Sequence, residues 1–462
     1  MTLSERAFQA LRQITGHNYC TRKKEDLVCY AYDATARKYP PDAVVFPASA
    51  EEISRILELA CREKFIIVPR GSGSGMTGGS LAVNGGVVLV TSRLNRILDI
   101  DRDNLVARVE PGVITGDFHA AVERLGLFYP PDPASSAFST LGGNVAECAG
   151  GPRAVKYGVT RDYVLGLKVV LPTGEIIHTG VSTAKGVVGY DLTRLMTGSE
   201  GTLGIIAEIT LRLLPLPEDI RTMTAVFPSM KSAAQTVSRI IQQGLIPRTI
   251  EYMDNNSIRC VETSLNAGLP VDAAAILLLE VDGSPSANRE ALTRLEEICR
   301  DQGAVDIKTA ENREAADRLW RARKAVSPAL YAFAPDKINE DIVVPRNRIP
   351  DMVEMIKRIG DETGLVTASF GHAGDGNIHV NIMLDKSDSR QLQAAEKAVD
   401  ELFDYTLLLG GTISGEHGIG ITKSAYMGKE IGPTEMALMK KIKALFDPFN
   451  ILNPGKIFST GK

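Results

Sequence analysis

Residues 69–79 are Pro69-Arg70-Gly71-Ser72-Gly73-Ser74-Gly75-Met76-Thr77-Gly78-Gly79, and they follow a short apolar strand pattern. With no Cβ on the glycines, backbone N–H groups of this loop can gather around an anion. The loop lacks the Gly-Lys-Ser/Thr ending of a Walker loop, and it runs into more loop and a strand where a Rossmann turn would open a helix. The residues favour a phosphate cradle, with a plain flexible loop as the alternative.

The loop follows the second strand of a predicted strand–helix–strand unit. Residues 43–46 have a strand pattern, Ser49 and Glu52 form a capping box before an amphipathic helix, and residues 65–68 have the pattern of a second buried strand. More strands are expected at 87–90, 105–109, 165–171 and 205–213. The two prolines of Leu214-Pro215-Leu216-Pro217 suit a domain junction.

The alternation restarts from residue 222. Strands are expected at 223–227, 249–253 and 275–281, helices at 233–242, 289–300 and 349–359, and two glycine-interrupted strands around Phe370 and His379. The tail from 391 to 439 is expected to be helical, apart from a glycine-rich interruption. This pattern predicts an open α+β sheet with helices on one face. We expect an N-terminal helical segment (1–38), two domains (39–217 and 218–405) and a C-terminal segment (406–462).

Composition excludes several classes of protein. The chain has 462 residues, 44% hydrophobic and 23% charged, which is too long for one core and too apolar for disorder. A net charge of -4 gives no nucleic-acid or acidic-membrane surface. The six cysteines include no CxxC pair, residues 71–92 are too rich in glycine for a membrane helix, and the start has no signal peptide pattern, so a cytoplasmic location is expected.

More turn-rich segments accompany the loop at residues 69–79. They are Pro130-Pro131-Asp132-Pro133, Ser139-Thr140-Leu141-Gly142-Gly143-Asn144, Ala149-Gly150-Gly151 and Gly198-Ser199-Glu200-Gly201-Thr202-Leu203-Gly204-Ile205-Ile206. A long flat ligand could lie against backbone at such places. Here the chain resembles the flavoproteins of the vanillyl-alcohol oxidase type, in the branch of D-lactate dehydrogenase, the glycolate oxidase catalytic subunit and D-2-hydroxyglutarate dehydrogenase. The resemblance runs from about residue 40 to Asn453-Pro454-Gly455-Lys456.

The resemblance implies an α+β fold: a two-lobed FAD-binding domain, a cap domain for the substrate with an open antiparallel sheet, and a helical C-terminal tail that returns to the flavin. No His, Tyr or Cys can be assigned to covalent attachment, so dissociable FAD is expected. The resemblance assigns FAD binding to Arg70, Gly71, Ser72, Gly73, Ser74, Gly75, Pro131, Asp132, Thr140, Gly143, Asn144, Gly150, Glu200, Gly204, Ile206 and Asn453.

A histidine and carboxylate group carries a second signal. His372 and His379 flank Gly374-Asp375-Gly376-Asn377, which has the pattern of a strand reversal and would place the imidazoles near each other. Asn381 lies on the face of the strand that carries His379. Glu416-His417 adds a carboxylate and a third imidazole, and two histidines with one carboxylate suit a catalytic site for Zn, Mn or Fe. The resemblance assigns His372, His379 and Glu416 to the metal and His417 to proton abstraction. From the residues alone, either Glu416 or His417 could be the metal ligand and the other the base.

A substrate carboxylate needs a cationic partner. The resemblance places it at Arg323, with Ser327 one helical turn later. Hydroxyglutarate enzymes have a further lysine for the distal carboxylate, and residues 335–339 do not align cleanly with it. This departure favours a short 2-hydroxy acid.

The resulting hypothesis is an FAD-dependent dehydrogenase that oxidises D-lactate or glycolate to the 2-oxo acid by hydride transfer to flavin N5. The metal and His417 would assist, Arg323 would anchor the substrate carboxylate, and Asn381 would be a catalytic residue that points at the same site. With no iron–sulfur cysteines, haem motif or nicotinamide fingerprint, electrons would pass to an iron–sulfur subunit or an electron-transfer flavoprotein, which could hold the chain at the inner membrane. Alternatives are a D-2-hydroxyglutarate dehydrogenase, a non-catalytic FAD subunit and a zinc-stabilised scaffold.

Overall fold

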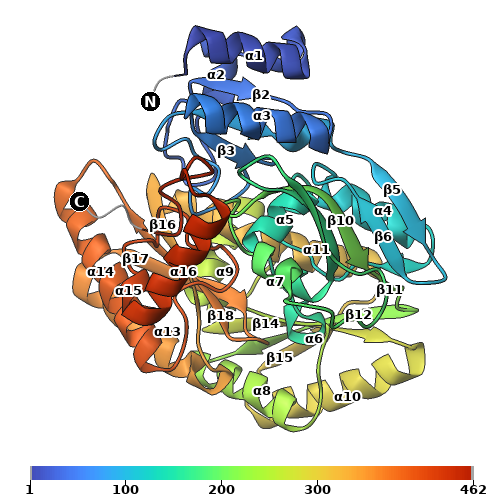
Figure 1. The fold of residues 1–462 in the computed structure, drawn as a ribbon. Helices are drawn as coiled ribbons and strands as arrows, with labels where there is room; N and C mark the ends of the chain where they lie inside the picture. Colours follow the sequence, from blue (N-terminus) through green and yellow to red (C-terminus); the bar gives the residue numbers. More distant parts are fainter. Residues whose placement is uncertain (1–2, 459–462) are drawn as a thin grey trace. The chain divides into compact units, whose positions relative to one another are not determined.

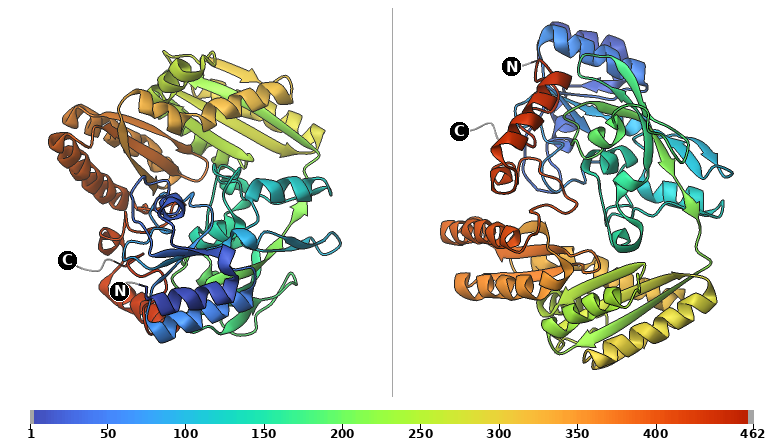
Figure 2. Two further views of the ribbon diagram at one scale, coloured as in Figure 1. Left: turned by 90° about the horizontal axis from the view of Figure 1, so that it is seen from above. Right: turned by 60° about the horizontal axis from the view of Figure 1, so that its bottom comes forward.

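The computed structural model describes residues 3–458, which divide into two compact units. The first comprises residues 1–150, 159–216 and 416–462, and the second comprises residues 151–158 and 217–415, each taken over its described part. The chain therefore passes between the units at four peptide links. Each unit has its own sheets and helices (Figures 1 and 2).

The first unit is built mainly of short elements. Its strands are β1 (Cys20–Thr21), β2 (Ala43–Val45), β3 (Ile67–Arg70), β4 (Val87–Val90), β5 (Ile97–Asp101), β6 (Val106–Val109), β7 (Leu127–Phe128), β8 (Val164–Val170), β9 (Ile176–Gly180), β10 (Ile205–Arg212) and β11 (Leu214–Pro215). Its helices are α1 (Glu5–Thr15), α2 (Lys24–Cys29), α3 (Ala50–Glu63), α4 (Thr115–Glu123), α5 (Leu141–Glu147), α7 (Leu192–Met196), α15 (Met427–Glu430) and α16 (Pro433–Phe446).

A parallel set of strands carries the glycine-rich loop. The order of this sheet is β1-β2-β4-β3, with β2, β4 and β3 parallel, so β3 delivers the loop at its carboxyl end. Ser49 caps α3 by accepting from the N–H of Glu52 at 3.2 Å, which confirms the predicted cap, while the Glu52 side chain accepts from the N–H of Ala48 at 2.8 Å and not from that of Ser49. Residues near the C-terminus extend the β3 edge: the N–H of Ile67 donates to the carbonyl of Ile451 at 2.8 Å, and that of Asn453 donates to the carbonyl of Ile67 at 2.8 Å.

The second sheet of this unit is antiparallel, in the order β5-β6-β10-β8-β9. Its strand β10 begins directly after the loop 198–204, so the sheet fixes that loop at one end. Helix α5 meets the same loop, because the N–H of Gly198 donates to the carbonyl of Val145 at 2.9 Å and that of Glu200 to the carbonyl of Ala146 at 2.8 Å. Two backbone hydrogen bonds therefore hold the loop against the helix.

The second unit has one large sheet. Its elements are α6 (Ala154–Tyr157), β12 (Asp219–Phe227), α8 (Met230–Gln242), β13 (Thr249–Asp254), α9 (Asn255–Leu265), β14 (Ala275–Gly283), α10 (Pro285–Asp301), β15 (Asp306–Thr309), α11 (Arg313–Lys324), α12 (Val326–Ala329), β16 (Asp336–Val343), α13 (Ile349–Thr363), β17 (Val366–His372), β18 (Asn377–Leu384) and α14 (Ser389–Leu408).

All seven strands of this sheet are antiparallel, in the order β15-β12-β14-β13-β17-β18-β16, as the expected fold class requires. Helices cover both faces, so the expectation of helices on one face is wrong. Side chains of α9, α11 and α12 form a core with one face, while α8, α10, α13 and α14 contact the strands from the other side (Figure 1). The sequence analysis did not predict helix α9.

The division into units differs from the expected boundaries at three places. Residues 1–38 are no separate segment, because Phe8 and Leu11 of α1 share a core with Ile53 and Ile56 of α3. Residues 406–415 stay with the second unit, where Thr412 pairs with the end of β16. Residues 151–158 also join the second unit, through contacts of α6.

A buried acid anchors α6. Asp282 accepts hydrogen bonds from the ammonium group of Lys156 at Oδ1 and from the hydroxyl of Tyr157 at Oδ2, the latter at 2.8 Å. Arg248 donates to the same Oδ2 at 2.9 Å, and the Asp282 side chain has no exposed area. One carboxylate therefore neutralises cations from two distant parts of the chain.

We expect Asp282→Ala to lower the free energy of unfolding by about 3 kcal/mol, because the buried Arg248 loses one of its two carboxylate partners and Lys156 and Tyr157 lose the acceptor that anchors α6. Urea denaturation measures the change. The control is Asp306→Ala, which removes the exposed ion pair with Lys308 on edge strand β15 and should cost no more than about 1 kcal/mol. Equal losses in the two variants would contradict the anchoring role.

Candidate active site

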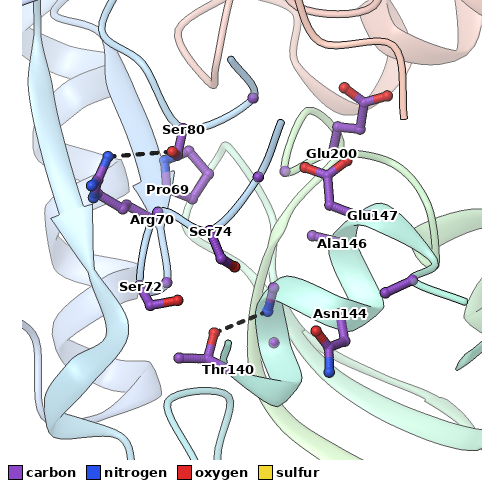
Figure 3. Close-up of a pocket in the computed structure, with 18 of the residues that line it drawn as sticks. Pro69, Arg70, Ser72, Ser74, Ser80, Thr140, Asn144, Ala146, Glu147 and Glu200 are labelled. Carbon is purple, nitrogen blue, oxygen red and sulfur yellow. Dashed lines mark hydrogen bonds between the residues drawn. The ribbon is translucent and has the colours of Figure 1, made fainter. Parts of the chain in front are cut away.

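A cavity in the first unit collects most of the glycine-rich segments (Figure 3). It is bounded by the loop after β3, the start of α5, the loop before β10 and the first residues of the C-terminal segment. The lining residues are Pro69, Arg70, Gly71, Ser72, Gly73, Ser74, Gly75, Met76, Gly79, Ser80, Thr91, Pro111, Pro133, Ala134, Ser135, Thr140, Gly142, Gly143, Asn144, Ala146, Glu147, Ala149, Ser199, Glu200, Gly201, Gly204, Ile205, Ile206, Glu416 and His417.

The loop after β3 has the properties of an anion cradle. Among residues 3–458, no group accepts a hydrogen bond from the backbone N–H groups of Ser72 to Gly75. Gly73 has φ of 76°, a conformation that glycine adopts without strain. The Arg70 guanidinium stabilises the loop by donating to the carbonyl of Tyr32 at 2.8 Å and to the Ser80 hydroxyl at 3.3 Å. The open N–H groups and the absence of Cβ atoms fit a pyrophosphate.

The other walls are held by hydrogen bonds within the unit. Thr140 caps α5 by accepting from the N–H of Gly143 at 3.2 Å, a bond drawn in Figure 3. Asn144, which is buried, donates to the Thr115 hydroxyl at 2.8 Å. At the C-terminal segment, the carbonyl of His417 accepts from the Thr77 hydroxyl at 3.1 Å. These contacts give the cavity a fixed shape.

Most residues that the resemblance assigned to FAD line this cavity, and four do not: Pro131, Asp132, Gly150 and Asn453. The amide of Asn453 is 1% exposed and donates to the carbonyls of Gly79 and Glu200, each at 2.9 Å. Asn453 therefore ties the C-terminal segment to two walls of the cavity.

The sequence analysis missed Glu147, which also lines the cavity. It is the last residue of α5, and nothing in the sequence Asn144-Val145-Ala146-Glu147 indicated a binding role for it. Burial, together with the neighbouring carboxyl of Glu200, raises the pKa of Glu147 well above its ordinary value.

A polar cluster in the second unit occupies one face of four adjacent strands, β13, β17, β18 and β16. Cross-strand pairs share a face, and Glu251 pairs with His372, Asn339 with Asn381, and Asp341 with His379. Because Phe370 pairs with His379, all three pairs lie on the same face of the sheet. The order of the strands, which the sequence analysis did not predict, brings this cluster together.

The two imidazoles lie next to each other, as the hairpin pattern predicted. The ring centroids of His372 and His379 are 5.2 Å apart, with ring planes at 88°. Each imidazole has a carboxylate at Nδ1: the Glu251 Oε1 lies 2.6 Å from that of His372, and the Asp341 Oδ1 lies 3.8 Å from that of His379. Carboxylates in this position fix the tautomer and the ring orientation of metal-binding histidines.

Arg323 reaches the same cluster from α11. Its Nη2 lies 2.6 Å from Glu251 Oε2, and its guanidinium carbon is 4.8 Å from the centroid of the Phe370 ring. Burial alone would raise the pKa of Glu251, but the charges of His372 and Arg323 outweigh burial and lower it. The Nε of Arg323 is buried and donates to no group of the described chain, so it can serve an incoming acceptor.

The remaining members extend the cluster along β16. Asn339 donates to Asn381 Oδ1 at 2.9 Å and thereby fixes the side-chain orientation of Asn381. Lys337 donates to the Ser327 hydroxyl at 2.6 Å, and burial lowers its pKa to about 8. In the sequence, residues 335–339 do not align cleanly with the further lysine of hydroxyglutarate enzymes. The structure places Lys337 two residues before Asn339 on the same face of β16, where it bonds Ser327, one helical turn after Arg323.

Comparison with known proteins identifies the family. Residues 216–457 match the FAD linked oxidases, C-terminal domain, and residues 41–180 match an FAD binding domain.

The chain belongs to the FAD-linked oxidase family.

Relatives of this FAD-linked oxidase cover nearly its whole length. It is 45% identical over 452 residues to "Glycolate oxidase subunit GlcD" of Bacillus subtilis (98% of this chain, 96% of the relative), and 36% identical over 428 residues to "D-lactate dehydrogenase" of Anaerostipes hadrus (91% and 90%). The solved structure of p-cresol methylhydroxylase with substrate bound has a TM-score of 0.81 at 19% identity, covering 98% of this chain and 96% of that one. This likeness confirms the expected fold. Within residues 3–458, no helix has the length and apolarity needed to cross a bilayer.

Proposed function

We propose that this FAD-linked oxidase oxidises a short D-2-hydroxy acid, D-lactate or glycolate, to the 2-oxo acid and passes the electrons to a partner protein. A divalent metal, Zn, Mn or Fe, would be held by His372, His379 and Glu416. The names of the relatives support the substrate class, since they include a glycolate oxidase subunit and a D-lactate dehydrogenase.

The observation that carries the metal proposal is the pair of imidazoles with a carboxylate at each Nδ1. With Nδ1 of His372 engaged by Glu251 at 2.6 Å, Nε2 becomes the ligand atom of that ring, while Asp341 lies 3.8 Å from Nδ1 of His379. Glu416 follows Gly415, whose N–H donates to Asp341 Oδ2 at 2.9 Å, so Asp341 is linked both to His379 and to the residue before the third ligand. Two nitrogens and one carboxylate leave room for a substrate.

Each residue has a separate task in this proposal. Bound FAD supplies the two-electron acceptor at N5, and a bound divalent ion supplies a Lewis acid for the substrate oxygens. Arg323 holds the substrate carboxylate through its open Nε, while Glu251 fixes the guanidinium. Asn381 orients the hydroxyl, and His417, which lines the FAD cavity, takes the hydroxyl proton.

A second candidate, oxidation of a D-2-hydroxy dicarboxylate, is favoured by Lys337. Its ammonium group bonds Ser327, one turn after Arg323, and could hold a distal carboxylate. Anaerobic titration with D-lactate, L-lactate, glycolate and D-2-hydroxyglutarate, followed by flavin bleaching, tests both candidates. Bleaching by none of these acids would contradict the proposed function.

We expect Lys337→Met to separate the two candidates. If the substrate has one carboxylate, KM should change little. If Lys337 binds a distal carboxylate, KM for D-2-hydroxyglutarate should rise about 10- to 100-fold, the loss expected for a charge-assisted hydrogen bond. Initial rates with D-lactate and D-2-hydroxyglutarate in parallel measure the difference, and D-lactate serves as the internal control.

We also propose that FAD is bound without a covalent link. Among the residues that line the cavity, His417 is the only histidine and none is a cysteine or tyrosine. Acid precipitation should release the flavin into the supernatant. Colour that stays with the pellet would contradict this expectation and would make His417 the first residue to examine for attachment.

A further inference from the structure

The carboxyl group of Glu147 has no task in the proposed reaction, although it lines the FAD cavity at the end of α5. Figure 3 shows it beside the carboxyl of Glu200. A Cβ placed on Gly418 would meet oxygens of both carboxyl groups, which confirms that the two lie together in space. Two acids in one buried place do not both ionise at ordinary pH.

Glu200 is the partner that keeps the charge. Its Oε1 accepts from the N–H of Ile419 and its Oε2 from the N–H of Gly420, each at 2.7 Å. Two backbone donors bind the ionised form of a carboxyl more strongly than the neutral form, and they oppose the effect of burial, which raises the pKa of Glu200. The ammonium group of Lys456 adds a favourable charge.

Glu147 has no such support. Neither of its oxygens has a hydrogen bond within residues 3–458, and Oε2 is buried. Lys456 favours its ionised form, but burial and the charges of Glu200 and Asp33 oppose it and raise its pKa. Its Oε1 would lie 2.9 Å from a Cβ on Gly79, so the group sits against the glycine-rich loop. A neutral carboxylic acid in this place presents one O–H donor.

We propose that the carboxyl group of Glu147 is neutral and donates a hydrogen bond to an acceptor atom of FAD. FAD carries oxygens and ring nitrogens that can only accept hydrogen bonds. Such an atom suits the O–H of Glu147, which has no hydrogen-bond partner within residues 3–458. Binding FAD then satisfies a polar group that is otherwise buried and unpaired. The inference concerns cofactor binding, so it holds or fails independently of the metal and of the substrate.

Two substitutions separate this role from its alternatives. Glu147→Gln keeps a neutral donor of the same shape, and its Kd for FAD should stay within about threefold of the parent value. Glu147→Leu removes the donor at similar size and should raise Kd about 10-fold, the effect of one lost hydrogen bond. Kd is measured on apoprotein from the quenching of flavin fluorescence. The matched control is Glu123→Leu, an exposed glutamate at the end of α4, which should leave Kd unchanged.

The protonation state is read directly in the infrared spectrum. FAD-loaded parent protein should show the carbonyl stretch of a protonated carboxylic acid that is missing from Glu147→Gln, and this comparison stays informative if Glu147→Leu does not fold. The proposal is overturned if that band is absent, if Glu147→Leu binds FAD as tightly as the parent, or if Glu147→Gln binds FAD more than 10-fold tighter, as removal of a negative charge would predict.

Discussion

A His417→Asn variant is expected to reduce its flavin about 10²- to 10⁴-fold more slowly than the parent protein when the 2-hydroxy acid is added. Asparagine has a similar size but cannot take the hydroxyl proton, so about 3 to 5 kcal/mol of transition-state stabilisation is lost. The FAD content should not change, because the bond from the Thr77 hydroxyl to the carbonyl of residue 417 uses the backbone of that residue and survives the substitution. Stopped-flow absorbance under anaerobic conditions measures the rate.

The neighbouring residue provides the matched control. Glu416→Gln should lose the metal and keep FAD, whereas His417→Asn should keep both, as elemental analysis and the flavin spectrum would report. The opposite pattern, with His417→Asn emptied of metal and Glu416→Gln still loaded, would exchange the two roles and leave hydride transfer to flavin in place.

A Glu251→Ala variant should lose about 3–5 kcal/mol of unfolding free energy and about 10- to 100-fold in metal affinity. The carboxylate is 1% exposed and serves both Arg323 and His372, so its removal leaves a buried guanidinium unpaired and frees the imidazole to rotate. Urea denaturation of the metal-free protein gives the first quantity, and metal titration followed by competition with a chelator gives the second.

An exposed glutamate supplies the comparison for this variant. Glu296→Ala removes an ion pair with Arg300 on the surface of α10 and should change the stability by less than about 0.5 kcal/mol. If Glu251→Ala unfolded at the same urea concentration as Glu296→Ala, Glu251 would not be the partner that holds Arg323 and His372 in place.

Local signals explain what could be predicted from the sequence. The glycine-rich loop, the cap at Ser49 and the hairpin between His372 and His379 each depend on residues close together in the chain, and the structure has them where expected. The partners of the histidines could not be found in this way. Glu251 and Asp341 come from strands whose neighbours are set only by the order of the whole sheet.

The predicted domain boundaries differ from the two units of the structure for the same physical reason. Residues 151–158 carry no sequence mark of their membership in the second unit, which depends on Asp282 more than a hundred residues later. Glu147 likewise has an ordinary place at a helix end, and only the folded structure brings it beside Glu200. Long-range charge pairing is therefore the part of this protein that periodicity cannot reveal.

The C-terminal extension of the β3 edge has a consequence for how the protein is made on the ribosome. Ile67 emerges early, but the carbonyl of Ile451 that accepts its N–H is synthesised near the end, as are Asn453 and Lys456, which bond the carbonyls of Gly79 and Leu81. These bonds to Ile67, Gly79 and Leu81 can therefore form only after the whole second unit has been translated. Contacts so far apart in sequence close slowly, and a chain interrupted within α16 would contain every residue that lines the cavity but would lack the residues that tie the loop after β3 in place.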